Sequence, residues 1–291
     1  MKKKLVIFTG AGISKESGIP TFRDEGGLWK TVPMELVCTP EGLRKNPEAV
    51  HEFYNELRDE MLTKEPNSAH YDCVELEKYF DVTVVTQNVD NLHEKAGSSN
   101  VIKIHGDLTK VRSTGNSNLV WTHLGHTDPE MKIEGHRIRP HIVFFYEDLL
   151  DFPKAKKACR EADLMIVVGT SLQVFPAASL LEEVQYGNKI YYVDPNPGTV
   201  PELCVSDVEI IKDTATKGMK KVMHKILSYV KDERGGQLMT LEEFNEAKRM
   251  WLSVTDDGSG YYSDGVVVFD DMEVASSVPD ERCTHVIWFG K

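Results

Sequence analysis

Four polar side chains that could bind a ligand and move a proton lie near the ends of strand-like segments. Gln87, Asn88 and Asp90 directly follow an apolar run, and His105 comes further along the chain. Val89 is expected to point into the protein while its neighbours face a cleft. An imidazole with an unperturbed pKa of ~6.5 suits a general base. A lone histidine before glycine is more often structural, so a catalytic role depends on the surrounding motifs.

The turn after the first expected strand is a second candidate site. The short β-branched run 5–8 predicts a buried parallel strand. Gly10 and Gly12 let the backbone turn tightly, and N–H groups at the start of the next helix would face a phosphate. The usual dinucleotide fingerprint has glycine where Lys15 stands, and the acidic residue expected about 20 residues later has no clear candidate. The glycines therefore indicate a phosphate site or close packing of the turn.

Three segments resemble, in the expected order, the signatures of one family. They are GAGISKESGIPTFR at 10–23, TQNVDNLH at 86–93 and HG at 105–106. The family is the sirtuins, which are NAD-dependent protein lysine deacylases. The resemblance covers about residues 1–230 and leaves the end of the chain unexplained.

The resemblance implies an NAD site and a set of catalytic residues. The implied catalytic residues are His105, Asn88 and Asp90. Phe22 and Arg23 have alternative roles, as a core side chain and a salt-bridge partner, and Gly-Thr-Ser is also an ordinary helix cap. The implied cofactor-binding residues are Gly10, Ala11, Gly12, Ser14, Phe22, Arg23, Gln87, Asn88, Asp90, Gly169, Thr170, Ser171 and Asn196.

The resemblance also implies a mechanism. In sirtuins the acyl oxygen of the substrate attacks the ribose C1′ and releases nicotinamide, and the histidine then promotes attack by the 2′-hydroxyl. The acyl group ends on ADP-ribose. Two alternatives remain: an NAD-consuming ADP-ribosyltransferase or glycohydrolase, and a non-catalytic NAD sensor. The intact set of Asn88, Asp90 and His105 argues against the sensor.

A further segment, 139–147, resembles the sirtuin substrate loop. There an acyl-lysine peptide adds as a strand between this segment and residues 173–177, so that main-chain pairing provides affinity with little sequence demand. The alternative is a plain core strand. The side chains expected to contact the peptide and its acyl-lysine are Val143, Phe144, Val174 and Phe175.

Two further features depart from the family pattern, one of them in the acyl pocket that the resemblance implies. Sirtuins that remove acidic acyl groups pair a tyrosine with an arginine three residues later. Here Tyr54 is followed at that spacing by Leu57, and Arg58 would point elsewhere on a helix. We therefore predict a preference for neutral acyl groups. Tyr146 stands where the family usually has glycine, and the sequence does not reveal the effect.

The metal site of the family is also missing. Sirtuins usually carry two Cys-x-x-Cys pairs after the His-Gly motif, which hold a structural zinc. No cysteine lies between His105 and Glu147, and Ser113 stands where the first would fall. Histidines in a polar loop are more often solvated than metal-bound, so we expect no zinc; those present are His123, His126 and His136.

Composition excludes several function classes. The 291 residues carry a net charge of −12, with no basic stripe for a nucleic-acid backbone. No apolar run approaches the ~20 residues needed to span a membrane. Five scattered cysteines fit a reducing compartment. We therefore expect a cytoplasmic protein that binds neither nucleic acid nor membrane.

Strand, turn and helix patterns alternate along the first part of the chain. Apolar runs at 82–86, 164–168 and 190–193 join 5–8 as expected strands of a doubly wound, parallel Rossmann-like α/β sheet. Residues 24–80 look mostly helical, and residues 108–139 look polar and irregular. We expect these two segments to form a smaller inserted domain within a catalytic domain of residues 1–231.

Residues 232–291 form a different compositional unit, with a net charge of −8. Residues 232–237 resemble a linker, and Thr240 with Glu243 predicts a capped helix. Residues 265–269 and 284–289 predict two paired strands. We expect a small α+β appendage that docks on the catalytic domain or recruits a basic partner; the alternative is a disordered acidic tail.

Overall fold

The computed structural model describes residues 2–21, 32–201, 204 and 207–227, with four further strands between 237 and 289. Phe22 and Arg23 lie outside the described residues. Contacts within the chain divide it into two compact units, Met1–Met219 and Lys220–Lys291.

A six-stranded parallel sheet forms the centre of the first unit, as the sequence predicts. The strand order is β10-β9-β8-β1-β2-β3. The four expected strands are confirmed, whereas the short edge strands β3 and β10 were not expected. The bounds are β1 (Lys4–Thr9), β2 (Asp81–Thr86), β3 (Val101–Lys103), β8 (Leu164–Val168), β9 (Lys189–Val193) and β10 (Asp207–Ile211).

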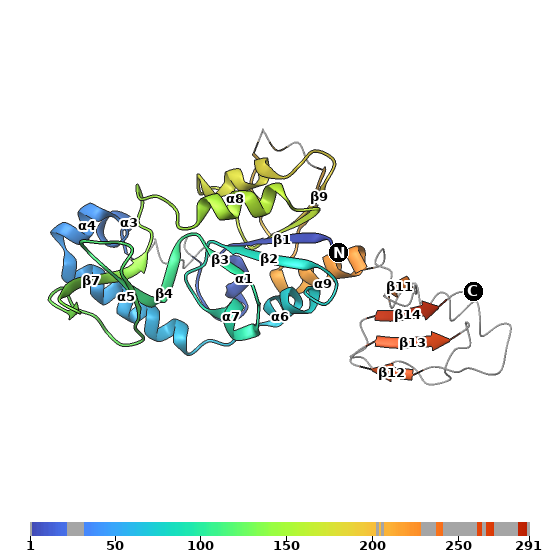
Figure 1. Ribbon diagram of the computed structural model, residues 1–291, viewed down its shortest axis with the longest axis horizontal. Coiled ribbons are helices and arrows are strands. Elements are labelled where there is room, and N and C mark those ends of the chain that lie inside the picture. The colour runs from blue at the N-terminus through green and yellow to red at the C-terminus, as the bar shows by residue number, and fades with distance from the viewer. Residues whose placement is uncertain are drawn as a thin grey trace. The chain divides into compact units, whose positions relative to one another are not determined.

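Helices cover both faces of this sheet. Figure 1 shows α8 on one face and α6 and α7 on the other. Val6 and Phe8 of β1 pack into the core beneath α8, so Leu5 and Ile7 point to the opposite face, and all four are buried. This explains why β1 is a continuous apolar run. The helices of this unit that surround the sheet are α1 (Gly12–Lys15), α6 (Ser68–Leu76), α7 (Leu92–Ala96), α8 (Phe152–Arg160) and the 3-10 helix η1 (Ala177–Glu183). Helix α9 (Ala215–Leu227) spans the boundary between the two units.

Strand register gathers the candidate motifs at one edge of the sheet. Thr9 of β1 lies opposite Thr86 of β2 on one side and Val168 of β8 on the other. The glycine turn, the segment starting at Gln87 and the turn at Gly169 therefore leave the sheet together, at the carboxyl ends where α/β folds bind ligands.

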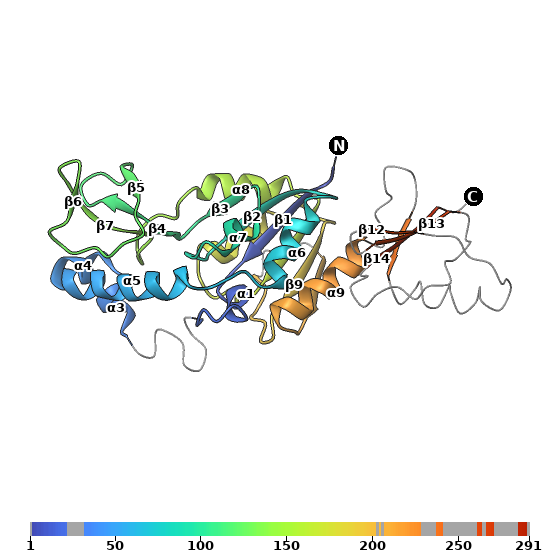
Figure 2. The same ribbon diagram turned by 90° about the horizontal axis from the view of Figure 1, so that it is seen from below.

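A smaller layered structure carries the other side of the site. Helices α3, α4 and α5 lie against an antiparallel sheet of order β5-β4-β7-β6 (Figure 2). The expectation of irregular structure over 108–139 was therefore wrong. The strands contain buried arginines, which make their sequence resemble that of a polar loop. The bounds are α3 (Met34–Val37), α4 (Pro40–Lys45), α5 (Pro47–Leu62), β4 (Gly106–Ser113), β5 (Val120–Thr122), β6 (Lys132–Ile133) and β7 (His136–Ile142).

The second unit contains a four-stranded sheet of order β11-β14-β13-β12. The strands expected at 265–269 and 284–289 are confirmed, and they pair in parallel. Thr240, the expected helix cap, ends strand β11, and residues 241–260 lie outside the described residues. The bounds are β11 (Gln237–Thr240), β12 (Tyr261–Ser263), β13 (Val266–Asp270) and β14 (His285–Phe289).

Candidate functional site

His105 lies where the large sheet passes into the small one. Its Nδ1 lies 3.0 Å from the carbonyl oxygen of Gln87. Because a carbonyl only accepts, Nδ1 carries the proton and Nε2 keeps its lone pair. Burial lowers the pKa of His105, while the bond to Gln87 opposes this shift. The imidazole is therefore neutral at pH 7 and can accept a proton at Nε2.

Gly106 makes this position possible. Its φ of +101° lies in the left-handed region that favours glycine. A side chain there would collide with the backbone of His141 on β7. His-Gly is thus required by the sharp entry of the chain into β4.

Three buried polar side chains beside β2 are linked by hydrogen bonds. The amide of Asn88 donates to Ser14 Oγ at 3.1 Å, and Ser14 Oγ donates to Asp90 Oδ2 at 2.8 Å. Burial raises the pKa of Asp90, although hydrogen bonds from Leu92 N and Ser14 oppose the shift. With Ala11 and Val89, these three side chains line a hollow of about 20 Å³. The predicted residues Ala11, Ser14, Asn88 and Asp90 therefore converge at one place.

The glycine turn packs tightly against a second turn. The N–H groups of Gly10 and Gly12 donate to the carbonyls of Val168 and Gly169 at 3.0 and 2.8 Å. A Cβ on Gly12 would collide with Gly169. The expectation that N–H groups at the start of the next helix face a phosphate does not hold for Gly12, whose N–H is bonded to Gly169. Both glycines serve the close packing that the sequence left as the alternative.

The turn after β8 joins this arrangement. The side-chain amide of Gln87 donates to Thr170 Oγ1 at 3.0 Å. The hydroxyl of Tyr192 donates to the Thr170 carbonyl at 2.7 Å and accepts from Gly198 N at 2.8 Å. Sequence reasoning missed Tyr192, which reads as an ordinary strand residue. The next helical segment, η1, begins only at Ala177, so Gly-Thr-Ser does not cap a helix.

Ser171 and Asn196 lie at the same edge of the sheet. Ser171 is partly exposed directly after Thr170. Asn196 is exposed just beyond β9, and its N–H donates to the side chain of Asp194 at 2.8 Å. Both positions therefore leave their side chains accessible on the adjoining surface.

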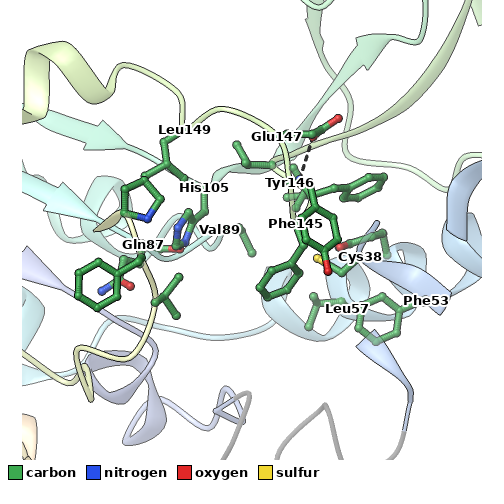
Figure 3. A pocket seen from close by; sticks show the side chains of 17 residues that line it. Cys38, Phe53, Leu57, Gln87, Val89, His105, Phe145, Tyr146, Glu147 and Leu149 are labelled. Carbon is green, nitrogen blue, oxygen red and sulfur yellow. Dashed lines mark hydrogen bonds between the residues drawn. The ribbon is translucent and has the colours of Figure 1, made fainter. Parts of the chain in front are cut away.

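A cavity of about 180 Å³ lies in front of His105. Figure 3 shows His105 and Gln87 on one side of it and Cys38, Phe53 and Leu57 on the other. All four predicted substrate residues contribute to its wall. Cys38, Phe145, Leu149 and Pro176 were not predicted, because only the tertiary fold brings them here. The lining is Cys38, Phe53, Tyr54, Leu57, Gln87, Val89, His105, Ile142, Val143, Phe144, Phe145, Tyr146, Glu147, Leu149, Val174, Phe175 and Pro176.

No lysine or arginine stands among the described residues that line this cavity. Arg58 is fully buried elsewhere, and its Nε donates to the Leu108 carbonyl at 2.9 Å. The hydroxyl of Tyr54 is hydrogen-bonded to Cys38, and burial raises the pKa of Tyr54 well above its ordinary value. The wall formed by α5 is therefore apolar.

The residues of the small sheet do not fit a zinc ion. Ser113 Oγ accepts the N–H groups of Gly115 and Asn116 at 3.2 and 3.1 Å, which closes the turn by hydrogen bonds. His126 pairs with Asp59 at 2.6 Å, His123 contacts the His126 carbonyl at 3.0 Å, and the ring of His136 lies by that of Trp121. In the part of the chain that is described, no group of three or more His, Cys, Asp or Glu side chains is arranged to hold a metal.

The parallel sheet, the polar groups at its carboxyl edge and the neutral histidine define a ligand-binding α/β protein with an acid–base residue. The sequence profile of the Sir2 family matches residues 10–176. The chain belongs to the Sir2 family, so the resemblance to sirtuins is confirmed.

The sequence of this chain is similar to those of known relatives over most of their length. A protein of Bacteroides thetaiotaomicron is 42% identical over 77% of this chain and 98% of the relative. One from Aggregatibacter actinomycetemcomitans is 47% identical over 68% of this chain and 96% of the relative. Both are named NAD-dependent protein deacylase. The crystal structure of a Sir2 homologue–NAD complex has a TM-score of 0.68 and 37% identity, covering 77% of this chain and 90% of that one.

None of the helices in the described residues is both long and apolar enough to cross a membrane.

Proposed function

We propose that this protein is an NAD-dependent protein lysine deacylase, which transfers the acyl group to ADP-ribose with release of nicotinamide. The observation that carries the proposal is the position of His105. Its Nδ1 is fixed by the Gln87 carbonyl, and its unprotonated Nε2 faces an apolar cavity beside the Asn88–Ser14–Asp90 chain. The names of the relatives support the same activity.

The polar edge of the sheet fits NAD. Buried Asn88 and Asp90 offer hydrogen bonds to an amide or a ribose, and the glycines let the turns at Gly12 and Gly169 pack closely at the same edge. When bound, NAD supplies the ribose that receives the acyl group and the nicotinamide that leaves. We assign its binding to Gly10, Ala11, Gly12, Ser14, Gln87, Asn88, Asp90, Gly169, Thr170, Ser171 and Asn196, and to Phe22 and Arg23 outside the described residues.

In this mechanism His105 is the general base. Its Nε2 accepts the proton of the attacking hydroxyl, and the Gln87 carbonyl stabilises the imidazolium through Nδ1–H. Asn88 and Asp90 orient the departing amide. The apolar wall of α5 limits water near the reacting bond.

The peptide would enter as an added strand. Val143 N donates to the His105 carbonyl at 2.9 Å, so the expected substrate segment is attached directly to the base. Phe144 and Val143 from one segment, and Val174 and Phe175 from the other, wall the cavity from two sides. An acyl-lysine placed between them would reach His105 with its acyl group.

One experiment separates this proposal from its alternatives. Nicotinamide release is measured with purified protein and NAD, with and without an acetyl-lysine peptide. A deacylase releases nicotinamide only with the peptide and forms deacetylated product. An ADP-ribosyltransferase or glycohydrolase releases it without deacetylation, and a sensor releases none.

The acidic end of the chain has a separate role in this proposal. Every residue assigned above precedes residue 232, so the segment 232–291 is not needed for the chemistry. Its net charge of −8 suits recruitment of a basic partner. A chain ending at Lys231 should deacetylate peptides within about twofold of the full chain. Complete loss of turnover in a folded truncated protein would contradict this division.

A further inference from the structure

Tyr146 combines a strained backbone with an exposed aromatic ring. Its φ is +73°, in the left-handed region where a residue with a side chain is strained. Its side chain is 94% exposed, the highest value for a large hydrophobic residue in the described part of the chain. Neither burial nor backbone preference explains a tyrosine at this position.

The turn that carries Tyr146 is held firmly. Glu147 N donates to the Phe144 carbonyl at 3.1 Å, and Phe144 N donates to Glu147 Oε2 at 2.8 Å. Glu147 also accepts from Arg112 at 2.8 Å and from Arg139 at 2.6 Å. A positive φ at the third position of a four-residue turn normally selects glycine. The backbone that carries the ring is therefore held at a fixed place.

That place is the border between two hollows. Tyr146 lines the cavity in front of His105 (Figure 3) and also a surface hollow of about 640 Å³ beside α3 and α4. Pro33, Leu36 and Pro40 form the apolar wall of this second hollow. Of its two acidic residues, Glu41 is paired with Lys45 at 2.6 Å and Glu35 lies in the first turn of α3.

We propose that Tyr146 is a specificity-determining residue that selects a large apolar or aromatic side chain two positions from the acyl-lysine. In an extended peptide, residues two apart point to the same face. A peptide whose acyl-lysine enters the cavity therefore directs that second side chain to the rim, between the Tyr146 ring and the wall of Pro33, Leu36 and Pro40. This inference rests on the proposed function, because it takes the occupant of the cavity to be an acyl-lysine peptide.

The test compares acetyl-lysine peptides that differ only at the two positions two residues from the lysine, with Phe, Leu, Lys or Gly at each. The wild type should favour Phe or Leu over Gly by about five- to tenfold in kcat/KM, the scale of one partly buried aromatic contact. Tyr146→Gly should reduce this ratio to within about twofold, whereas Tyr146→Phe should keep it. Because glycine relieves the strained φ, Tyr146→Gly should melt no lower than the wild type.

Tyr186→Gly is the matched control, since Tyr186 is 86% exposed and lines neither hollow. It should keep the ratio. A wild type without the preference, a preference for Lys, or a Tyr146→Gly variant that keeps the ratio overturns the inference.

Binding of the same fluorescent peptides, measured by anisotropy, reads the subsite without turnover. If no peptide supports nicotinamide release but Phe peptides bind more tightly through Tyr146, the proposed function fails and the subsite stands. If release depends on the peptide but is indifferent to the flanking residue, the subsite fails and the proposed function stands.

Discussion

The two sides of the cavity differ in the kind of side chain that they present. The side formed by the large sheet carries polar groups fixed by the backbone, such as His105 through the Gln87 carbonyl. The side formed by the small layered structure is apolar, with Phe53 and Leu57 from α5. The residues of the polar side stand in the short signatures at 86–93 and 105–106, whereas Phe53 and Leu57 stand outside the segments that resemble the family.

Hydrogen bonds from buried polar side chains support the small layered structure. Arg58 joins α5 to the carbonyls of Leu108 and Gly125, at 2.9 and 3.2 Å. The side-chain amide of Asn55 donates to the Thr127 carbonyl at 2.8 Å, and its oxygen accepts from Thr127 N at 2.9 Å. The comparison teaches that the two sides use polar side chains differently: His105 keeps an acceptor atom for a ligand, whereas Arg58 and Asn55 bind main-chain groups of the protein itself.

The largest expected effect lies on the polar side. His105→Ala should lower peptide-dependent nicotinamide release by ~10²-fold or more, the usual scale for loss of a general base, with NAD affinity nearly unchanged. Steady-state kinetics and calorimetric NAD titration measure the two quantities. His136→Ala, on the exposed small sheet, is the control and should keep full activity. Full activity of His105→Ala would refute the assignment.

Breaking the support of the apolar side should affect stability more than chemistry. Arg58→Met removes a buried guanidinium that serves three acceptors, which should lower the free energy of unfolding by about 2–4 kcal/mol. Urea denaturation measures this change. Arg137→Met removes an exposed ion pair with Glu130 and should cost under about 1 kcal/mol.

The same denaturation experiment tests the metal. Because Ser113 already closes its turn by hydrogen bonds, a chelator should leave the wild-type transition unchanged. One tightly held zinc per chain, found by elemental analysis, would contradict this account of the small sheet.

A positive charge on the apolar side should shift acyl selectivity toward acidic acyl groups. The wild type should favour acetyl over succinyl peptides, because the described residues that line the cavity beside Leu57 offer a buried carboxylate no cationic partner. Leu57→Arg should raise the succinyl-to-acetyl ratio of kcat/KM by about tenfold or more, the scale of one charge-assisted hydrogen bond. Leu57→Met keeps the apolar wall and should keep the preference. A wild type that prefers succinyl would disprove the idea.

The smallest effect is a displacement of the pH profile. Burial lowers the pKa of His105, and the base acts in its neutral form. Activity should therefore persist as pH falls through ~6.5, the ordinary histidine value, and be lost only at a lower pH. An acid limb of kcat/KM at or above that value would conflict with the buried, neutral imidazole.

Folding must be followed over the same pH range. Burial lowers the pKa of His70 to about 4. Between that value and ~6.5 the unfolded chain binds more protons than the folded one, so stability decreases as pH falls through this window. Melting temperatures at each pH separate this loss from titration of His105.

The sequence predicted the large sheet better than the small one. The segments that form β1, β2, β8 and β9 are apolar because both faces of the sheet are covered. Continuous apolar runs of this kind can be recognised in the sequence. The strands β4 and β7 carry Arg112 and Arg139, whose charges are buried against Glu147. That pairing joins residues far apart in the chain, so a local pattern reads the arginines as surface.

The candidate site divides in the same way. Asn88, Asp90 and His105 were found because they stand in short signatures beside strand ends. Tyr192 and Cys38 were missed because only tertiary contacts reveal their roles. The hydroxyl of Tyr192 donates to the Thr170 carbonyl, and Cys38 lines the cavity. Such contacts leave no mark in spacing or composition.

Gly106 has a mechanical consequence. It joins His105 to β4 without an intervening loop, and the His105 carbonyl is held by Val143 N just after β7. His105 is thus anchored from both sheets, by the Gln87 carbonyl just after β2 and by Val143 N just after β7. A side chain at residue 106 would meet the His141 backbone and push β7 away, so one added methyl group would pull the two anchors apart.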